Sequence, residues 1–388
     1  MDPEWLQDLE TDEGGEDESR GRLRIPRPAP SPDLRFGGLF SDASMHLPRD
    51  EPRGKGQARG MMRSGRLGNT DLSVSRVGFG CSGFGDVFGP TDAPQRLRAV
   101  DAALDLGVNF FDTSPYYGLT LSETRLGEAL AGRRSRALLS TKCGRYGFAE
   151  FDFSAARIRG GLEGSLARLR TDYVDLLLAH DVEFGDERQI VEETIPALRS
   201  LQREGKARYI GITGYPVHLL KRIARQAPVD AILTYCRYDL LNQDAGTVLA
   251  PFAAEQRIGL ISASPLSMGL LTAQGPPDWH PAAKALGRLS DDVARICARH
   301  GCEVSDVALR FSLHAPGIDT TLVGAASASQ VRAAVEAAET PAPPDLLRAI
   351  EERVRQAGLT AWPSGRPENA DPEMTAPNSG APSDAPTS

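Results

Sequence analysis

Four side chains that could take part in proton transfer stand at or just after the ends of three consecutive apolar runs in this chain of 388 residues. Asp112 lies at the end of one run with Tyr117 five residues later, Lys142 follows the next run, and His180 follows the third. Three of them have an ordinary structural explanation: Asp112 as a turn cap, Lys142 as a solvated strand end and His180 as a core histidine. Because polar groups at buried strand ends are costly unless they are paired, three such endings in a row indicate a functional site.

The chemistry that this set supports is proton transfer coupled to another step. A tyrosine has a pKa of about 10, which is too high for an efficient base at neutral pH. A lysine ammonium would stabilise the phenolate of Tyr117, and an aspartate behind the lysine would keep it charged and oriented. We expect this to lower the pKa of Tyr117 by about two to three units, or ~3–4 kcal/mol. A histidine can orient the substrate oxygen.

Eight short apolar runs of strand type recur along the middle of the chain. Most intervals between them hold one amphipathic helix, as the spacing i, i+4, i+8, i+11 of Ile158, Leu162, Leu166 and Leu169 indicates. Strands that are apolar throughout and alternate with helices predict a parallel sheet covered on both faces. The predicted strands are residues 77–80, 109–113, 137–141, 174–179, 209–213, 231–236, 260–263 and 320–323.

Eight such units predict an α/β fold, a closed (β/α)8 TIM barrel, whose active site lies at the carboxyl ends of the strands. An open nucleotide-binding sheet would need GxGxxG after its first strand. Residues 78–83, GFGCSG, have that spacing, but they lead into no predicted helix. The long interval before the last run is expected to hold a loop with Trp279 and His280 and two helices.

Composition divides the chain into one globular part and two tails. Residues 1–62 and 363–388 hold many of the prolines, glycines and charges, and we predict that both are disordered. Residues 63–362 are predicted to form a single barrel domain, close to the ~250 residues of one such fold.

Charge and cysteine content exclude several classes of protein. Lys+Arg number 44 and Asp+Glu 52, a net charge of −8 without a basic stripe, which argues against nucleic-acid binding. Five cysteines without a CxxC pair favour reduced thiols over disulfides or a metal site. Neither an apolar run of ~18 residues nor a secretory signal is present, so we expect a cytoplasmic protein that does not enter the membrane. The sequence does not indicate the oligomeric state.

Six separated motifs resemble those of the aldo-keto reductases, and their order and spacing cover essentially all of residues 63–365. They are NFFDTSPYYG, STKCG, DLLLAH, GIT, SPLSMGLL and LVGAASASQV. More narrowly, TKCGRY, HDVEFG and the late WPSG look like the L-galactose dehydrogenases and the D-threo-aldose (L-fucose) 1-dehydrogenases of that family.

The resemblance implies a barrel without a Rossmann domain, a nicotinamide cofactor, and a catalytic tetrad of Asp112, Tyr117, Lys142 and His180. The family's spacing selects Tyr117, which directly precedes a glycine, over Tyr116. The implied reaction is oxidation of an aldose such as L-galactose or L-fucose. The Tyr117 phenolate takes the proton of the anomeric hydroxyl, C1 delivers hydride to the nicotinamide, and the product is a lactone.

Several positions depart from the family pattern around the nicotinamide. Thr213 and Gly214 stand where many members carry a Ser-Asn pair that holds the carboxamide, and Gly214 has no side chain for that purpose. Tyr235 stands at the position of a glutamine, and Ala263 replaces a tyrosine that stacks on the nicotinamide ring. We hypothesise that Tyr235 supplies the stacking face; the alternative is that it only fills the top of the barrel.

The rest of the cofactor is expected to lie along the loop after the seventh strand and the N-terminus of the last barrel helix, which can bind phosphate. Members that bind NADP place Lys or Arg there to pair the 2′-phosphate. Residues 324–331 contain neither, and Arg332 comes one turn later, so NAD is favoured over NADP. The residues implied for the pyrophosphate, phosphate and adenine are Ser264, Leu266, Gly269, Gly324, Ser327 and Gln330.

Polar groups on the strand-end loops predict a sugar pocket, because a substrate with several hydroxyls needs such partners. The substrate candidates are Arg145, Tyr146, Asp181 and Trp279, and the same loops also carry Asp86, Glu183 and Arg237. Two other functions stay open: an NADPH-dependent reductase of aldehydes, and a cofactor-binding sensor subunit without turnover. The polar pocket and the phosphate loop without basic residues count against the first, and the intact tetrad counts against the second.

Overall fold

The computed structural model describes residues 62–358 and 360–372. The predicted disordered segment 1–62 therefore lies, except for Met62, outside the described residues. So does the part of the predicted C-terminal tail that follows residue 372.

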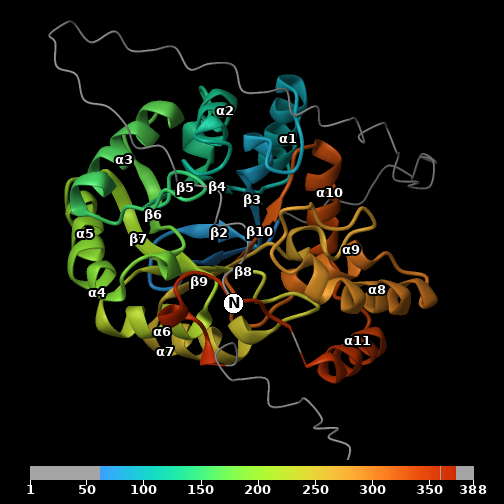
Figure 1. Ribbon diagram of the computed structural model, residues 1–388. Helices are drawn as coiled ribbons and strands as arrows, with labels where there is room; N and C mark the ends of the chain where they lie inside the picture. The colour runs from blue at the N-terminus through green and yellow to red at the C-terminus, as the bar shows by residue number, and fades with distance from the viewer. Residues whose placement is uncertain (1–61, 359, 373–388) are drawn as a thin grey trace, which may run out of the picture. The chain divides into compact units, whose positions relative to one another are not determined.

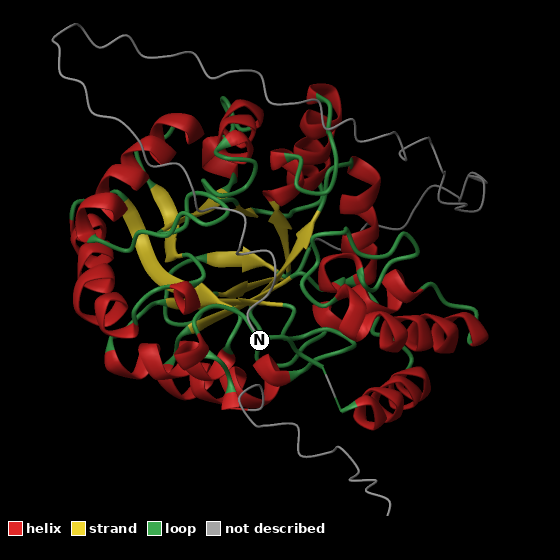
Figure 2. Ribbon diagram, in the orientation of Figure 1, coloured by secondary structure: helices red, strands yellow, loops and turns green. Residues whose placement is uncertain are grey.

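Eight parallel strands close into a barrel, and helices surround it (Figure 1, Figure 2). The order around the barrel is β10-β3-β4-β5-β6-β7-β8-β9, so β10 closes onto β3. The predicted (β/α)8 TIM barrel is confirmed, and each predicted strand boundary lies within two residues of the observed one. The strands are β3 (Val77–Gly80), β4 (Phe110–Asp112), β5 (Leu138–Cys143), β6 (Val174–Ala179), β7 (Ala207–Gly214), β8 (Ala231–Tyr235), β9 (Gly259–Ala263) and β10 (Thr320–Gly324).

The helices follow the strands and bury one apolar stripe each. In α3 all four residues of the predicted stripe are buried, and Ser154 caps its first turn by accepting from Arg157 N. The two helices expected before the last strand are α8 and α9. The helices are α1 (Ala93–Asp105), α2 (Leu121–Ala129), α3 (Ala155–Leu169), α4 (Glu187–Gln189), α5 (Ile195–Arg203), α6 (Val217–Gln226), α7 (Ala250–Gln256), α8 (Ala283–Arg299), α9 (Val304–Leu313), α10 (Ala328–Ala337) and α11 (Pro344–Ala357).

A short hairpin that the sequence patterns did not predict closes the amino-terminal end of the barrel. Strands β1 (Ser64–Arg66) and β2 (Ser73–Ser75) pair antiparallel. Leu67, Leu72 and Val74 are buried and pack against the apolar side chains inside the barrel. The side chains of this hairpin therefore fill the amino-terminal end of the barrel.

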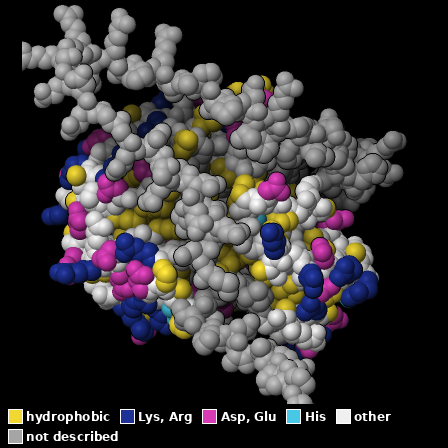
Figure 3. All heavy atoms as spheres, viewed as in Figure 1, with side chains coloured by type: hydrophobic (Ala, Val, Ile, Leu, Met, Phe, Trp, Pro, Cys, Tyr) yellow, Lys and Arg dark blue, Asp and Glu magenta, His cyan; other side chains and the backbone are white. Residues whose placement is uncertain are grey.

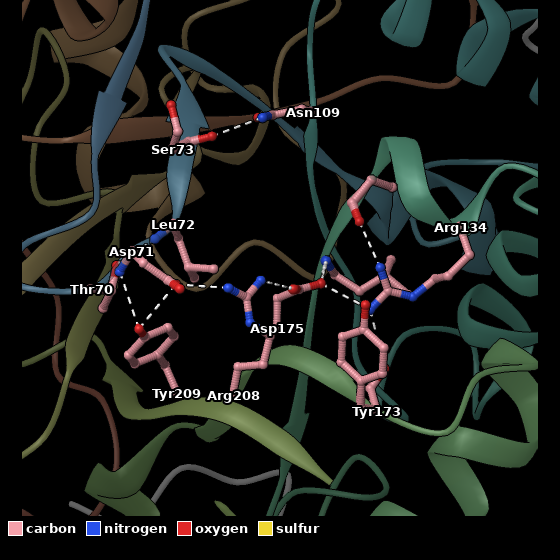
Figure 4. A network of polar contacts seen from close by, with 12 residues as sticks. Thr70, Asp71, Leu72, Ser73, Asn109, Arg134, Tyr173, Asp175, Arg208 and Tyr209 are labelled. Carbon is pink, nitrogen blue, oxygen red and sulfur yellow. Dashed lines mark hydrogen bonds and ion pairs between the residues drawn. The ribbon is translucent and has the colours of Figure 1, made fainter. Parts of the chain in front are cut away.

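Figure 4 shows the polar network that ties this hairpin to the starts of β6 and β7. Asp175 accepts from Arg134 at 2.9 Å and from Arg208 at 2.7 Å, and Arg208 also binds Asp71 at 2.7 Å. The hydroxyl of Tyr209 donates to Asp71 at 3.0 Å. Since Asp175 is almost fully buried and two guanidinium groups neutralise it, this network fixes the closed end of the barrel.

The C-terminal boundary of the folded part differs from the prediction. We predicted disorder from residue 363, but residues 363–372 lie on the barrel and include the 3-10 turn Pro367–Asn369. Asn369 and Asp371 are buried, and Asp371 forms an ion pair with the buried Arg237 at 2.7 Å. The composition of this segment is that of a tail, but specific buried polar contacts hold it in place.

On the face seen in Figure 3, acidic and basic side chains alternate around the margin and form no large patch of one sign. Within the part of the chain that the structure describes, no helix combines the length and the apolar character needed to span a bilayer.

Candidate active site

The three polar strand ends lie side by side because their strands are neighbours in the barrel. Asp112 of β4 is in register with Ser140 of β5, and Lys142 of β5 is in register with Leu178 of β6. The Lys142 ammonium is buried and donates to Asp112 Oδ2 at 2.5 Å and to the carbonyl of Thr113 at 2.8 Å. This places one positive charge at a fixed point at the open end of the barrel.

Tyr117 completes this group from the turn after β4. Lys142 Nζ lies 3.3 Å from the Tyr117 hydroxyl, whereas the ring of Tyr116 lies under the guanidinium of Arg145 at 3.7 Å. The glycine that follows Tyr117 is required by the packing. Gly118 has a φ of +63°, and a Cβ there would lie 2.3 Å from the carbonyl oxygen of Gly85. The turn can therefore press against the loop after β3 only if residue 118 is glycine.

His180 faces Tyr117 from the end of β6. The two rings are perpendicular, with centroids 5.8 Å apart. Nδ1 of His180 is 3.0 Å from the hydroxyl of Ser114, a buried residue that no sequence pattern singled out. Burial lowers the pKa of His180 well below its usual value, and the nearby positive charges of Lys142 and Arg145 add to this. The imidazole is therefore neutral at pH 7 and can orient a substrate oxygen without carrying charge.

The protonation of Tyr117 differs from the expectation. We expected Lys142 to lower its pKa, but burial raises the pKa of Tyr117 to about 12; Lys142 opposes the rise and Asp112 adds to it. The prediction is wrong for this structure because the cost of burying a phenolate exceeds the stabilisation by Lys142. Although burial alone would lower the pKa of Lys142, the charge of Asp112 raises it, so the ammonium persists.

Arg145 and Asp181, two of the predicted substrate residues, form a buried ion pair beside His180. Asp181 Oδ2 lies 3.7 Å from His180 Nε2. The guanidinium of Arg145 stacks on Tyr116, and its Nε is buried without a hydrogen-bond partner. A buried donor with no partner is uncommon, so this pair is suited to binding a polar ligand.

Of the other two substrate candidates, the structure engages Tyr146 elsewhere. Tyr146 points to α3, where its hydroxyl donates to the carbonyl of Arg157 at 3.0 Å, so the prediction that Tyr146 is a substrate residue is wrong for this structure. Successive side chains along an extended segment point in opposite directions. That rule could have shown that Tyr146 and Arg145 do not share a face. Trp279 is 47% exposed and contacts Phe88 of the loop after β3.

Two further polar residues of these loops are engaged elsewhere. Arg237 is fully buried, binds Asp244 at 2.8 Å and Asp371 at 2.7 Å, and stacks on Tyr215. Asp86 forms an ion pair with Arg125 at 2.8 Å. Both ion pairs stabilise loops, and Nε and Nη1 of Arg237 are buried without a hydrogen-bond partner.

The residues expected to hold the nicotinamide lie at the ends of adjacent strands. Gly214 of β7, which follows Thr213, is in register with Thr234 of β8, and Tyr235 is in register with Ala263 of β9. The Tyr235 hydroxyl lies 3.5 Å from Glu183 Oε1. The three strand ends thus form one continuous edge beside the Arg145 and Asp181 pair.

The loop after β9 has an unusual backbone. Ser264 and Met268 have φ values of +58° and +48°, and Gly269 has +105°. Leu266 is partly buried against the outer helices. Non-glycine residues with positive φ are often found at binding sites, where the surrounding structure holds them in place. The position of this loop over a cofactor stays a prediction.

At the N-terminus of α10, the contacts of the Gln330 side chain differ from the sequence-based expectation. Gln330 was expected to contact adenine, but Gln330 Oε1 accepts from the backbone N–H groups of Ala326 and Ser327 at 2.8 and 3.1 Å. Ser327 Oγ accepts from Gln330 N in return, which completes a capping box. In this structure Gln330 therefore stabilises the helix start. Gly324 lies just before this cap and is exposed.

No metal centre was expected from the sequence. Among residues 62–358 and 360–372, no group of three or more His, Cys, Asp or Glu side chains has an arrangement that could bind an ion.

Comparison with known proteins identifies the family. The model of the aldo/keto reductase family matches residues 76–355. The chain is 46% identical over 313 residues to L-galactose dehydrogenase of Arabidopsis thaliana, covering 78% of this chain and 98% of that protein. It is 31% identical over 312 residues to D-threo-aldose 1-dehydrogenase of Pseudomonas sp, covering 72% and 94%. A solved aldo-keto reductase from Bacillus halodurans, in its holo form, superposes with a TM-score of 0.65 at 28% identity and covers 80% of this chain and 100% of that one. The chain is therefore an oxidoreductase of the aldo/keto reductase family.

Proposed function

We propose that this protein is an NAD-dependent aldose 1-dehydrogenase that oxidises L-galactose, L-fucose or a similar aldose at C1 to the lactone. The observation that carries the proposal is the contact of one buried ammonium, Lys142, with both Asp112 and the hydroxyl of Tyr117 at the open end of the barrel. The 46% identity to an L-galactose dehydrogenase supports the choice of substrate class.

Tyr117 would act as the proton acceptor in this direction. The anomeric O–H bond breaks, its proton passes to the phenolate of Tyr117, and the C1–O bond becomes the lactone carbonyl as hydride leaves C1. Lys142 stabilises the phenolate before transfer, and Asp112 keeps Lys142 charged. The neutral His180 would hold the reacting oxygen near Tyr117, since Ser114 fixes its ring through Nδ1. When bound, the nicotinamide supplies the acceptor for the hydride.

The strand ends fit a nicotinamide cofactor in two respects. Glu183 Oε2 is buried without a hydrogen-bond partner at the edge formed by β7 and β8, so a polar ligand group can satisfy it. Gly324 at the end of β10 is open, because a Cβ there would meet only Ser82 Oγ, at 3.9 Å. Thr213 and Tyr235 would contact the nicotinamide end of the cofactor.

The phosphates would lie between the loop after β9 and the start of α10. Ser264, Leu266 and Gly269 provide the loop, and Gly324 and Ser327 provide the helix start. NAD is favoured over NADP because residues 324–331 carry no positive charge to pair a 2′-phosphate. The nearest cation along the chain, Arg332, is exposed on α10.

The pocket for the sugar would be built on Arg145 and Asp181. Their ion pair is buried, and the unpartnered Nε of Arg145 can donate to a sugar hydroxyl. Trp279 could cover the ring from the loop after β9. A polar, charge-paired pocket of this kind suits a substrate with several hydroxyls better than an apolar aldehyde.

The test is an assay of the purified full chain with L-galactose, L-fucose, D-arabinose and D-glucose, with NAD and NADP in parallel, following the absorbance of the reduced cofactor. We expect turnover with at least one aldose and NAD. Turnover with NADP alone would contradict the cofactor assignment. Reduction of aldehydes without oxidation of any aldose would instead identify a reductase, and cofactor binding without turnover would identify a sensor.

The role of Tyr117 is tested by Tyr117→Phe, which keeps the ring and removes the proton acceptor. We expect loss of nearly all activity with unchanged affinity for NAD. Tyr116→Phe is the matched control, because its ring stacks on Arg145 and its hydroxyl is not needed in this mechanism. A fully active Tyr117→Phe enzyme would contradict the proposed mechanism.

A further inference from the structure

Glu183 carries a buried carboxyl group that takes no part in the proton and hydride transfer described above. The residue is fully buried at the loop after β6. Its Oε1 accepts from the backbone N–H of Tyr215 at 3.1 Å and from the hydroxyl of Ser364 at 3.0 Å, and the Tyr235 hydroxyl lies 3.5 Å away. Its Oε2 has no hydrogen-bond partner. A buried carboxyl oxygen without a partner is costly, which suggests that a ligand completes it.

The unpartnered oxygen lies beside Gly214, at the end of β7. A Cβ on Gly214 would be 2.5 Å from Glu183 Oε2, so the carboxyl occupies the space that a side chain at position 214 would enter. The resemblance to the family implies an asparagine at this position, whose amide would hold the nicotinamide carboxamide. Here the polar group at this edge comes from a different strand end.

We propose that Glu183 replaces the missing side chain at position 214 and orients the nicotinamide through a hydrogen bond from Oε2 to its carboxamide. This inference rests on the proposed function, because it requires a nicotinamide cofactor. It assigns to Glu183 a role that no sequence pattern indicated, since in the sequence it is only one of several polar groups on the strand-end loops.

The hydrogen-bond partners of Glu183 also indicate the direction of this bond. Burial and the nearby Asp181 raise the pKa of Glu183 to about 8, so the carboxyl holds a proton at pH 7. Oε1 already accepts from Tyr215 and Ser364, which places that proton on Oε2. Oε2 is then a donor, and the carbonyl oxygen of the carboxamide is the acceptor that fits it.

The C-terminal segment fixes the position of Glu183. The backbone N–H of Arg366 and the side-chain amide of Asn369 donate to the Glu183 carbonyl at 3.0 and 2.8 Å. Gly365 passes so close that a Cβ there would lie 2.4 Å from the same oxygen. Residues 364–369 are therefore folded around Glu183, and the function we assign to this segment is to hold the carboxyl against β7.

The experiment compares the binding of NAD and of ADP-ribose, which lacks the nicotinamide, by isothermal titration calorimetry on the full chain. We expect Glu183→Leu to weaken NAD binding at least about tenfold, which corresponds to the loss of about 1.4 kcal/mol. ADP-ribose affinity should change less than about twofold, since only the nicotinamide contact is lost. Glu192→Leu, at an exposed glutamate, should leave both affinities unchanged.

Two other variants keep the inference testable if Glu183→Leu does not fold. Glu183→Gln places an N–H donor where Oε2–H stood and should bind NAD like the wild type. Gly214→Ala displaces the carboxyl and should weaken NAD selectively, whereas Gly287→Ala, where a Cβ meets nothing within 4 Å, should not.

Equal weakening of NAD and ADP-ribose in Glu183→Leu and Gly214→Ala would overturn the inference, because that would indicate a purely structural role. Unchanged binding of both ligands would overturn it as well. A wild-type chain that binds neither ligand would contradict the proposed function itself, which separates the two failures.

Discussion

Lys142→Met tests whether the lysine acts through Tyr117. The two groups are 3.3 Å apart, and at an effective dielectric constant of about 20 a unit charge at that distance contributes about 5 kcal/mol, or roughly three to four pKa units. The pKa of Tyr117 is already about 12 with Lys142 present, so the variant should leave even less phenolate. If oxidation requires the phenolate, the rate at pH 8 should fall by about three orders of magnitude.

The assay is a double-mutant cycle on the rate of aldose oxidation, with Tyr117→Phe as the second change. Groups that act as a unit show losses that are not additive. Adding Lys142→Met to Tyr117→Phe should therefore cost little more than Tyr117→Phe alone. If Lys142→Met reduces the rate by the same large factor in both backgrounds, Lys142 acts independently of Tyr117 and the reasoning is refuted. Thermal unfolding of each variant controls for the loss of the buried ion pair.

Three further predictions concern stability, measured by urea unfolding. The pKa of Glu183 is raised to about 8 in the folded state. Between the pKa of this residue in the unfolded chain and about 8, the folded protein therefore binds one proton more than the unfolded chain. Its stability should fall as the pH rises through that window. Glu183→Gln, which does not titrate, should remove that part of the slope, and an unchanged slope would contradict the assignment. Asp371→Ala should cost about 2 kcal/mol through loss of a buried charged contact. The exposed control Asp345→Ala should stay within about 0.5 kcal/mol, and equal effects would contradict the buried role. Gly118→Ala should reduce the free energy of unfolding by at least about 2 kcal/mol more than Gly132→Ala. Both glycines have positive φ, but only at Gly118 would an added Cβ lie within 3 Å of backbone atoms. Similar losses of stability in the two variants would show that this contact is unimportant.

The barrel and the grouping of the reactive residues could be predicted because both depend on short-range patterns. Each strand is a run of apolar residues, and the polar residue that ends it is visible in the same few positions. The rule that parallel strands end at one face then brings Asp112, Lys142 and His180 together without further information. The position of Tyr117 could be chosen over Tyr116 only through the resemblance to a family.

The features that could not be predicted depend on contacts between distant parts of the chain. Glu183 and Ser364 are separated by 181 positions, and no local pattern links them. Residues 363–372 have the composition of a tail, and buried contacts of Asp371 with Arg237 and of Asn369 with Glu183 hold them in place. The pKa of Tyr117 was missed because pairing with Lys142 is visible in a sequence pattern, whereas the depth of burial is not.

Two buried carboxyl groups at the open end of the barrel have different roles, because their neighbours differ in charge. Asp112 lies 2.5 Å from an ammonium and serves to hold a positive charge beside Tyr117. Glu183 accepts from an uncharged backbone N–H and an uncharged hydroxyl, lies near the acidic Asp181, and keeps a proton at pH 7. Burial raises the pKa of both carboxyl groups, but only at Asp112 does a neighbouring ammonium, Lys142, oppose the rise. The charged side of this site is thus suited to moving a substrate proton, and the neutral side to holding a polar ligand without competing for that proton.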